Sequence, residues 1–525
     1  MLNFLKKYIA IFIALFLLVY YILLSWLLHR TGFEHSEAMF VAEKIKLLFE
    51  AQENTLLTLG TTFPSLIFLS SVIFVPFGYP FAPVLASISF TVLLFFFLLN
   101  DFSKSSMLPR RVFIPMILIL FLFHPGLIYA AISGRGVGAI LFFFYMVMRS
   151  LFKYYVSQTS FYLSMASIYL SCLVFSDYNF IWMLLAFFPF IFLVSLDGLK
   201  IAKDQPLVIQ YFEALNNRSQ RRKLANRTIA LYIIIFLLPI GALYLFRTLN
   251  YTHAGDSTYF LTSQYANWHV IGNNSVGNLI ASGDVQNALV QSHIVFQVYV
   301  LLLTPILLLV FFIFKGTIYE LFTLLAPFIL LSILLLDNQY YITVEYYLIF
   351  LILGLLGIFY YAGKKFNIKY LYPIIIVVAI LNVFTGIFYF KHSGDEEELA
   401  FFSSLKKIKN FSDERTTSEE YQLAAYISDI ADDTHKILMD DAAAFRIMAH
   451  LRTLRPVIMP VNNNFITVAE NPILGARFIC VAKSTNNLRG FTVLNDYNIH
   501  QMELKREFKP VIMFETEHWA IYKII

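Results

Sequence analysis

The sequence predicts a mainly α-helical protein that crosses a membrane many times and ends in a small α/β domain. Apolar residues make up 59% of the 525 residues and charged residues only 14%. Many apolar runs reach the ~20 residues that a helix needs to cross a hydrocarbon core of about 30 Å. After residue 391 the apolar runs shorten to strand length and charged residues become frequent. This change separates a membrane region from a terminal domain.

Eleven segments are long and apolar enough to be membrane-spanning helices. They are 8–28, 82–100, 113–129, 137–152, 158–175, 180–197, 228–246, 293–314, 318–336, 344–362 and 370–390. A further run at 63–79 contains prolines and a glycine, so we expect an interfacial or re-entrant piece of the first external loop. The first segment lacks a small-residue cleavage site before His29, which predicts a retained anchor.

The distribution of basic residues predicts the orientation, because Lys and Arg favour cytoplasmic loops. With eleven spans, one set of alternate loops holds most of the basic residues, whereas the other set has none between 251 and 292. The N-terminus is therefore expected in the cytoplasm and the terminal domain outside, as in a bacterial inner-membrane protein. The loops 29–80 and 247–292 are then external.

We expect the chain to divide after the last span. Residues 1–391 form the membrane region, 392–414 a linker or juxtamembrane helix, and 415–525 the external α/β domain. Alternating strand and helix patterns support this domain. They predict helices near 418–431 and 442–451, strands at 436–440, 456–460 and 477–482, and a hairpin at 510–524.

Several function classes lose support because their motifs are absent. The sequence has no HExxH, GxSxG, GxxxxGK[ST] or paired CxxC motif. The net charge of +5 comes largely from predicted cytoplasmic loops, where it suits membrane lipids and implies no nucleic acid. Cys172 and Cys480 predict neither a disulfide nor a metal site. SGRGVG at 133–138 is interpreted as close helix packing.

Candidate catalytic residues are acids on the predicted external face. Glu34, His35 and Glu37 follow the first span, in a segment whose apolar stripe predicts a helix on the membrane surface. A partly buried carboxylate there can act as a general base, since burial raises its basicity. Alternatively, the two glutamates only favour a helix N-terminus. Asp177 and Asp337 are further candidates, although each is more simply a helix cap.

Candidate phosphate ligands are Arg135 and Arg247, which stand at predicted external helix ends. A guanidinium presents a fork of donors that suits phosphate oxygens. For each arginine alone, an anchor at the membrane interface is the alternative. Together they favour phosphate binding, because the other external loops carry little positive charge.

These segments resemble the GT-C type polytopic glycosyltransferases, which include protein O-mannosyltransferases, aminoarabinose transferases and oligosaccharyltransferases. GFEHSEAMF at 32–40 is similar to the acidic motif of their first external loop, and TTFPSLIFLSSVIFVPFG at 61–78 to the Pro-x-Leu segment that follows it. FHPGLIYAAISGRGVGAILFF at 123–143 resembles a Pro-containing span, a short external loop and the next helix of the family. The stretch 424–482 is similar to the external domain of some bacterial members.

The resemblance implies transfer of a sugar from a polyprenyl-phosphate donor to an acceptor hydroxyl, with inversion, in the synthesis of cell-envelope glycans or glycoconjugates. It implies Glu37 or Glu34 as the general base, and Arg135 and Arg247 as ligands of the departing phosphate. His35 interrupts the acidic motif, so the resemblance assigns no metal and leaves a divalent metal open.

Two questions stay open at the level of sequence. The acceptor is a glycan, a lipid or a protein, and we expect the terminal domain to bind or shape it. A polytopic transporter or lipid-linked glycan flippase is the main alternative function, and a polysaccharide polymerase or ligase is another. A transporter would normally place ionisable residues at mid-membrane, whereas the predicted spans are nearly free of charge.

Overall fold

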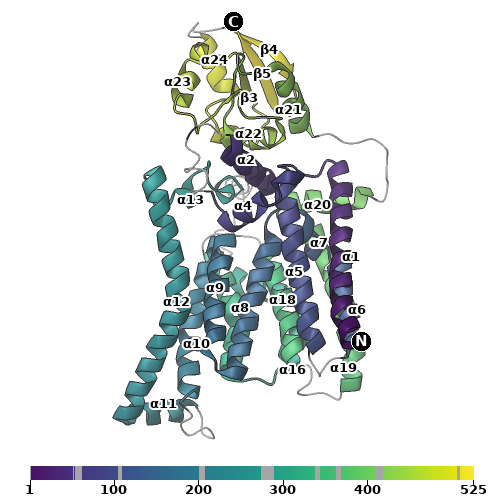
Figure 1. Ribbon diagram of the computed structural model, residues 1–525, viewed down its shortest axis with the longest axis vertical. Coiled ribbons are helices and arrows are strands. Elements are labelled where there is room, and N and C mark those ends of the chain that lie inside the picture. The colour runs from purple at the N-terminus through teal and green to yellow at the C-terminus, as the bar shows by residue number, and fades with distance from the viewer. Residues whose placement is uncertain are drawn as a thin grey trace.

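The computed structural model describes residues 2–50, 53, 62–104, 109–199, 207–272, 289–336, 343–361, 368–408, 418–504 and 509–525. Within these ranges the chain forms a bundle of long helices with an α/β domain stacked on one end (Figure 1). The C-terminus lies at the far side of this domain, and helix α1 starts at the other end of the bundle.

The bundle contains long helices and bent helix pairs. They are α1 (Leu2–Arg30), α5 (Ala82–Lys104), α6 (Arg110–Phe123), α7 (Pro125–Ile132), α8 (Val137–Ser157), α9 (Ser160–Ser176), α10 (Met183–Asp197), α12 (Arg218–Ala254), α15 (Leu289–Leu303), α16 (Pro305–Ile313), α17 (Ile318–Leu336), α18 (Val344–Tyr361) and α19 (Ile368–Lys391). Four shorter helices lie at the end that faces the domain (Figure 1): α2 (Ser36–Glu50), α4 (Ser65–Val72), α13 (Tyr259–Thr262) and α20 (Glu396–Lys407). Helix α11 (Leu207–Asn216) lies at the opposite end.

The predicted helical membrane architecture is confirmed, and every predicted span corresponds to a described helix or bent helix pair. Eight described helices are long and apolar enough to cross a membrane, or up to ten if each of two bent pairs forms one span. Helices α6 and α7 meet at 64° before Pro125, and α15 and α16 at 92° before Pro305. Proline lacks the amide hydrogen that continues a helix, which explains both bends. The remaining predicted span is α9, an apolar helix of only 17 residues.

The run at 63–79 forms only α4, of eight residues, and a short 3-10 turn at Val75–Phe77. Neither piece is long enough to cross a hydrocarbon core. This agrees with the expectation that the run does not form a complete span. Its helix packs under α2, near the end of the bundle that carries the domain.

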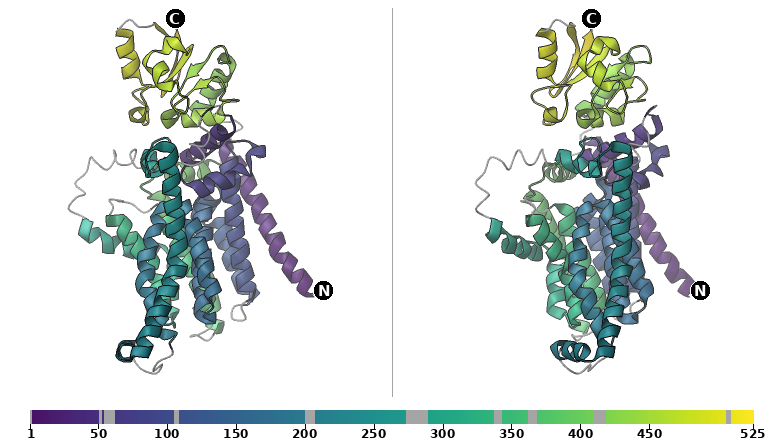
Figure 2. Two further views of the ribbon diagram at one scale, coloured as in Figure 1. Left: turned by 60° about the vertical axis from the view of Figure 1, so that its left-hand side comes forward. Right: turned by 90° about the vertical axis from the view of Figure 1, so that its left-hand side faces the viewer.

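Helix α18 is the centre of the bundle, and α1 and α12 are at its edge. Of the apolar window of α18, 89% is buried inside the protein, against 22% for α1 and 17% for α12. Figure 2 shows α1 leaning away from the other helices toward the N-terminus. The N-terminal residue of α18, Val344, therefore lies where the packed core meets the domain end.

The terminal domain has a five-stranded sheet in the order β2-β1-β3-β5-β4. The strands are β1 (Ile437–Leu438), β2 (Val457–Ile458), β3 (Phe478–Ala482), β4 (Pro510–Glu515) and β5 (Trp519–Ile524). β1 pairs in parallel with β2 and β3, whereas β5 pairs antiparallel with β3 and β4. The helices are α21 (Glu419–Ile430), α22 (Asp441–His450), α23 (Phe465–Glu470) and α24 (Asp496–Leu504).

Two apolar layers, one on each face of the sheet, hold the domain together. Along β3, Phe478 and Cys480 pack on the side of α21 and α22, while Ile479 and Val481 pack on the side of α23 and α24. This alternation is the two-residue period of a strand with both faces covered. The predicted order of strands and helices in this region is confirmed.

Helix α22 lies between the sheet and helix α2 (Figure 1). The rings of Phe40 in α2 and Phe445 in α22 meet edge to face, with centroids 5.8 Å apart. Leu47 of α2 belongs to the apolar core of the domain itself. The domain is thus docked directly onto the helix that follows the first span.

Candidate functional site

The site is built where a glycine-flanked loop meets the start of α2. Arg135 lies between Gly134 and Gly136, whose φ angles are +73° and +80°. A Cβ atom at Gly134 would lie 2.7 Å from Cβ of Ala38 in α2, and one at Gly136 would lie 2.5 Å from Cγ1 of Ile67 in α4. Only glycine fits both the left-handed backbone and these close approaches. The close packing expected for SGRGVG is confirmed, and it brings Arg135 under α2.

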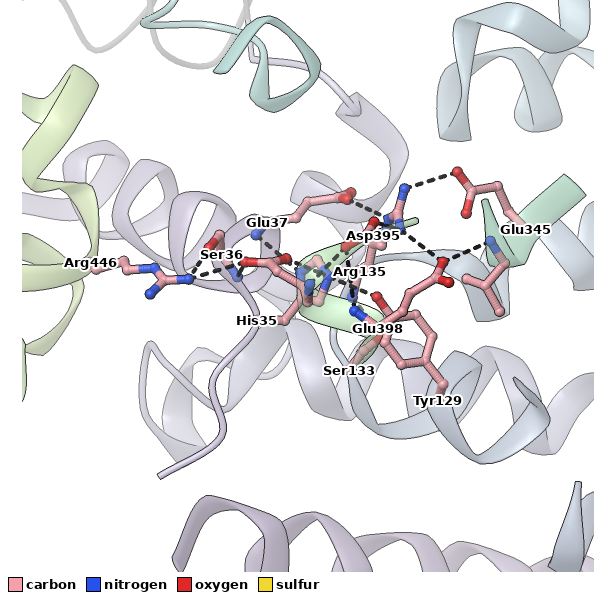
Figure 3. A network of polar contacts seen from close by, with 12 residues as sticks. His35, Ser36, Glu37, Tyr129, Ser133, Arg135, Glu345, Asp395, Glu398 and Arg446 are labelled. Atoms are coloured by element: carbon pink, nitrogen blue, oxygen red, sulfur yellow. Dashed lines mark hydrogen bonds and ion pairs between the residues drawn. The ribbon is translucent and has the colours of Figure 1, made fainter. Parts of the chain in front are cut away.

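Arg135 is surrounded by four carboxylates (Figure 3). Its Nη2 lies 2.9 Å from Oε1 of Glu345, and its Nε lies 3.4 Å from Oε2 of Glu37. Its Nη1 lies 3.5 Å from Oδ2 of Asp395 and 3.9 Å from Oε1 of Glu398. The arginine, Glu37, Glu345 and Glu398 are all buried. We call these five residues the Arg135 cluster.

The cluster has more acids than its one guanidinium can neutralise. Burial raises the pKa of Glu37 well above its usual value; Arg135 opposes this shift, and Glu345 adds to it. Burial, with Asp395 as the next cause, raises the pKa of Glu398 to about 8. Both shifts favour the protonated forms of Glu37 and Glu398. A carboxyl group with a raised pKa is a stronger base once it is ionised.

His35 is held beside the cluster in one tautomer. The backbone amide of Glu37 donates to Nδ1 of His35 at 3.1 Å, so Nδ1 carries no proton. Nε2 lies 2.8 Å from Oε2 of Glu397 and 2.8 Å from the Tyr129 hydroxyl. We therefore assign a neutral imidazole that donates from Nε2 to the Glu397 carboxylate. His35 is thus a structural link, and its acceptor nitrogen is occupied.

Glu34 points to a different place from Glu37. Its carboxylate lies 2.8 Å from Nε2 of His450 in α22 and 3.3 Å from Nδ1 of His29 in α1. Burial opposes ionisation, but the hydrogen bond from His450 and the nearby cations keep the pKa of Glu34 below its usual value. Glu34 also lines a small cavity between α1, α2 and the segment around Phe81.

Asp177 is both a cap and a neighbour of the cluster. It accepts from the backbone amide of Asn179 at 2.9 Å and from the Tyr346 hydroxyl at 2.6 Å. Burial raises its pKa and His269 opposes the shift, while Asp177 in turn raises the pKa of Glu37. The expected capping role is confirmed, and the fold adds an electrostatic contact with the site.

The other sequence candidates lie elsewhere. Asp337 lies outside the described residues. Arg247 lies in α12, and no described contact joins it to Arg135 or Glu37. Its Nε is buried and has no hydrogen-bond partner among the residues that the structure describes. Its role as a phosphate ligand stays a prediction.

Sequence reasoning missed the acids that complete the cluster. Asp395, Glu397 and Glu398 belong to the acidic run after the last span, which was interpreted as a linker or juxtamembrane helix. The structure forms the helix: Asp395 caps α20 by accepting from the amides of Glu397 and Glu398 at 2.8 and 3.3 Å. An Asp followed by three glutamates at the end of an apolar span was the available signal. Glu345 carried no such signal in the sequence, because a single acid in the first turn of an otherwise apolar helix is an ordinary feature.

The described residues include no group of three or more His, Cys, Asp or Glu side chains placed to hold a metal ion. The Arg135 cluster has its guanidinium at the centre, where a cation would otherwise sit. The described part of the chain therefore offers no ligand set for a divalent metal.

Comparison with known proteins gives one structural match to report. No protein-family model matches the sequence, and no curated protein matches it. Among solved structures, the chain is similar to the crystal structure of ArnT from Cupriavidus metallidurans bound to undecaprenyl phosphate. The match covers 97% of both chains, with a TM-score of 0.43 and 9% sequence identity.

Proposed function

We propose that this protein is a membrane glycosyltransferase that moves a sugar from a polyprenyl-phosphate donor to an acceptor hydroxyl. The observation that supports it best is the contact between the Glu37 carboxylate and the Arg135 guanidinium, 3.4 Å apart and buried at the end of the bundle. A base and a phosphate ligand are the two groups that such a transfer requires. The site would face the outside of the bacterial inner membrane.

Glu37 is proposed as the general base. It lies in the first turn of α2, outside the spans and at the end of the bundle that carries the domain. In the reaction, its ionised carboxylate takes the proton of the acceptor hydroxyl, and the oxygen attacks the anomeric carbon on the face opposite the phosphate. The bond from that carbon to the phosphate oxygen breaks, and polyprenyl phosphate leaves. Glu34 is the second candidate for the base, because it lines the adjacent cavity.

Arg135 is proposed to stabilise the departing phosphate. Its contacts to Glu37 and Asp395 are 3.4 and 3.5 Å, longer than the roughly 2.7–2.9 Å of a charge-assisted hydrogen bond. Only the contact to Glu345 reaches that length. The guanidinium therefore retains donors that a phosphate can engage, while Glu345 fixes its position.

A transporter is a weaker proposal for these contacts. Ionisable groups of a transport pathway usually lie near the middle of the membrane. The Arg135 cluster instead gathers side chains from α2, the 133–136 loop, the start of α18 and the start of α20, all at the domain end of the bundle.

The proposal is tested with the purified full-length protein in lipid nanodiscs. Polyprenyl phosphate carrying a radiolabelled sugar is supplied with a cell-envelope fraction as the acceptor source. We expect release of polyprenyl phosphate together with label in a polar product, and no turnover of a nucleotide sugar. Movement of the intact labelled lipid between leaflets without cleavage would instead identify a flippase.

A further inference from the structure

We propose that Arg446 of the terminal domain is a positioning residue of the active site, which acts on Glu37 through Glu397 and His35. The inference rests on the proposed function, since it assigns Glu37 a reaction to support. It adds a role to the expectation that the domain binds or shapes the acceptor.

The first step is the contact of Arg446 with the membrane region. Nη2 of Arg446 donates to Oε1 of Glu397 at 3.1 Å and also to Oγ of Ser36. Nη1 lies 3.5 Å from Glu420, within the domain. One guanidinium thus joins α22, α21, the start of α20 and the start of α2. Figure 3 shows Arg446 pointing toward Ser36.

The second step is the role of Glu397, which uses both oxygens to hold the start of α2. Oε1 accepts from the backbone amide of Ser36 at 3.0 Å, and Oε2 lies 2.8 Å from Nε2 of His35. Burial opposes ionisation, but His35 and Arg446 keep the pKa of Glu397 far below its usual value. Glu397 therefore stays a carboxylate and acts as an N-terminal cap that comes from a distant part of the chain.

The third step carries the constraint to the proposed base. Nδ1 of His35 accepts from the backbone amide of Glu37 at 3.1 Å. The first amides of a helix have no partner within it, and here those of Ser36 and Glu37 are satisfied by Glu397 and His35. The direction of the Glu37 side chain therefore depends on the pair formed by Arg446 and Glu397.

A second contact of α22 supports the same role for the domain. His450 lies one turn after Arg446 and reaches Glu34 at 2.8 Å. Phe445 and Ala449, each one position before these residues, pack on α2. The face of α22 that lies on α2 is thus occupied by contacts with residues 34–40. This surface positions the catalytic helix and is not available to bind an acceptor.

Loss of Arg446 should lower the rate of the chemical step more than it weakens donor binding. A misplacement of about 1 Å can cost roughly 100-fold in rate. We expect Arg446→Gln to lower kcat by about 10- to 100-fold with donor KM changed less than about threefold, because no described contact joins Arg446 to Arg135. Arg446→Lys should recover part of the rate, since one of two donors can be replaced.

The test uses the full-length protein and two independent readouts. Arg446→Gln, Glu397→Gln and the double variant are compared for kcat and KM, with Arg452→Gln as the matched control, because Arg452 pairs with Asp429 on the exposed surface of the same domain. Hydrogen exchange is measured at 33–40 and across the sheet. We expect a double variant no slower than the slower single variant, and faster exchange at 33–40 only.

The two readouts separate failure of the inference from failure of the proposed function. An active wild type whose kcat is unchanged in Arg446→Gln would overturn the inference and leave the transferase standing. If Arg446→Gln leaves hydrogen exchange at residues 33–40 unchanged, or raises it equally in the sheet, the inference is overturned. This result counts even if no transfer activity is found. If the wild type shows no transfer, but Arg446→Gln still raises exchange at residues 33–40 alone, only the proposed function is overturned.

Discussion

Nε of Arg135 lies 3.4 Å from Oε2 of Glu37, and the two side chains come from segments almost 100 residues apart in the sequence. Neither group reaches solvent freely, because both are at least nine-tenths buried. A guanidinium and a carboxylate in such surroundings influence each other strongly, since the local dielectric is far below that of water. The predictions below follow from this contact and from the acids around it.

The transfer rate should depend on pH through Glu37. Burial raises the pKa of Glu37, so its ionised fraction increases with pH well above the usual glutamate value of 4.5. We expect kcat/KM to rise with pH across the neutral range. Glu345→Gln removes a negative neighbour that raises this pKa, so the rise should move to lower pH. A rise centred near 4.5 in the wild type would contradict the assignment.

Replacement of Arg135 should weaken use of the donor. Loss of a charged hydrogen bond costs about 1.5–3 kcal/mol, or roughly one to two decades in kcat/KM. Arg135→Ala also leaves the surrounding acids without a cation, so folding is checked by thermal unfolding. Arg135→Lys should recover part of the activity, because the charge is kept and the fork is lost.

Arg247 gives a comparison for Arg135. It stands in α12 without a described contact to the cluster, so Arg247→Ala should cost less in donor kcat/KM than Arg135→Ala. An equal or larger loss would show that both arginines bind the donor phosphate, as the sequence predicted.

The docking of the domain should depend on a buried ion pair. Nζ of Lys44 lies 2.5 Å from Oδ2 of Asp441, and both side chains are nearly inaccessible. Lys44→Met leaves Asp441 as an unpaired buried charge, which typically costs about 3–5 kcal/mol. Adding Asp441→Asn should restore part of the thermal stability. Arg452→Gln removes an exposed ion pair and should leave the unfolding temperature unchanged. If this control lowers the unfolding temperature as much as Lys44→Met does, the buried pair has no special role in docking.

The predicted orientation is tested by cysteine labelling of intact cells. A cysteine at the exposed position 433 should react with a membrane-impermeant reagent, and one at exposed position 222 should react only after permeabilisation. Both native cysteines are first replaced by alanine. Protection of position 433 in intact cells would place the domain, and the site, in the cytoplasm.

Much of the fold follows from local patterns in the sequence. Long apolar runs predicted the helices of the bundle, and short apolar runs such as Phe478–Ala482 predicted the strands of the domain. The sequence did not predict that helices bend before Pro125 and Pro305 inside two of these apolar runs. Hydrophobicity alone does not show such bends.

The site was predictable only in part. The position of Glu37 after the first span and the glycines beside Arg135 are visible in the sequence. The grouping of Glu345, Asp395 and Glu398 around Arg135 depends on packing between segments up to 263 positions apart, from 135 to 398. The pairing of Asp441 with Lys44 likewise depends on packing between distant segments, whereas Asp440 caps α22 locally by accepting from the amide of Ala442 at 3.1 Å.

The most direct test of the account is the transfer rate of Glu37→Gln measured beside Glu43→Gln. Both residues are buried in α2, and burial raises the pKa of Glu43 to about 8, so a neutral amide should replace its protonated form with little change. The account predicts that Glu37→Gln lowers kcat by about 100-fold or more, the range of a lost general base, while the protein stays folded and binds the donor. Glu43→Gln should keep a rate near that of the wild type. Wild-type turnover in Glu37→Gln would contradict the account and make Glu34, at the cavity, the base to test next.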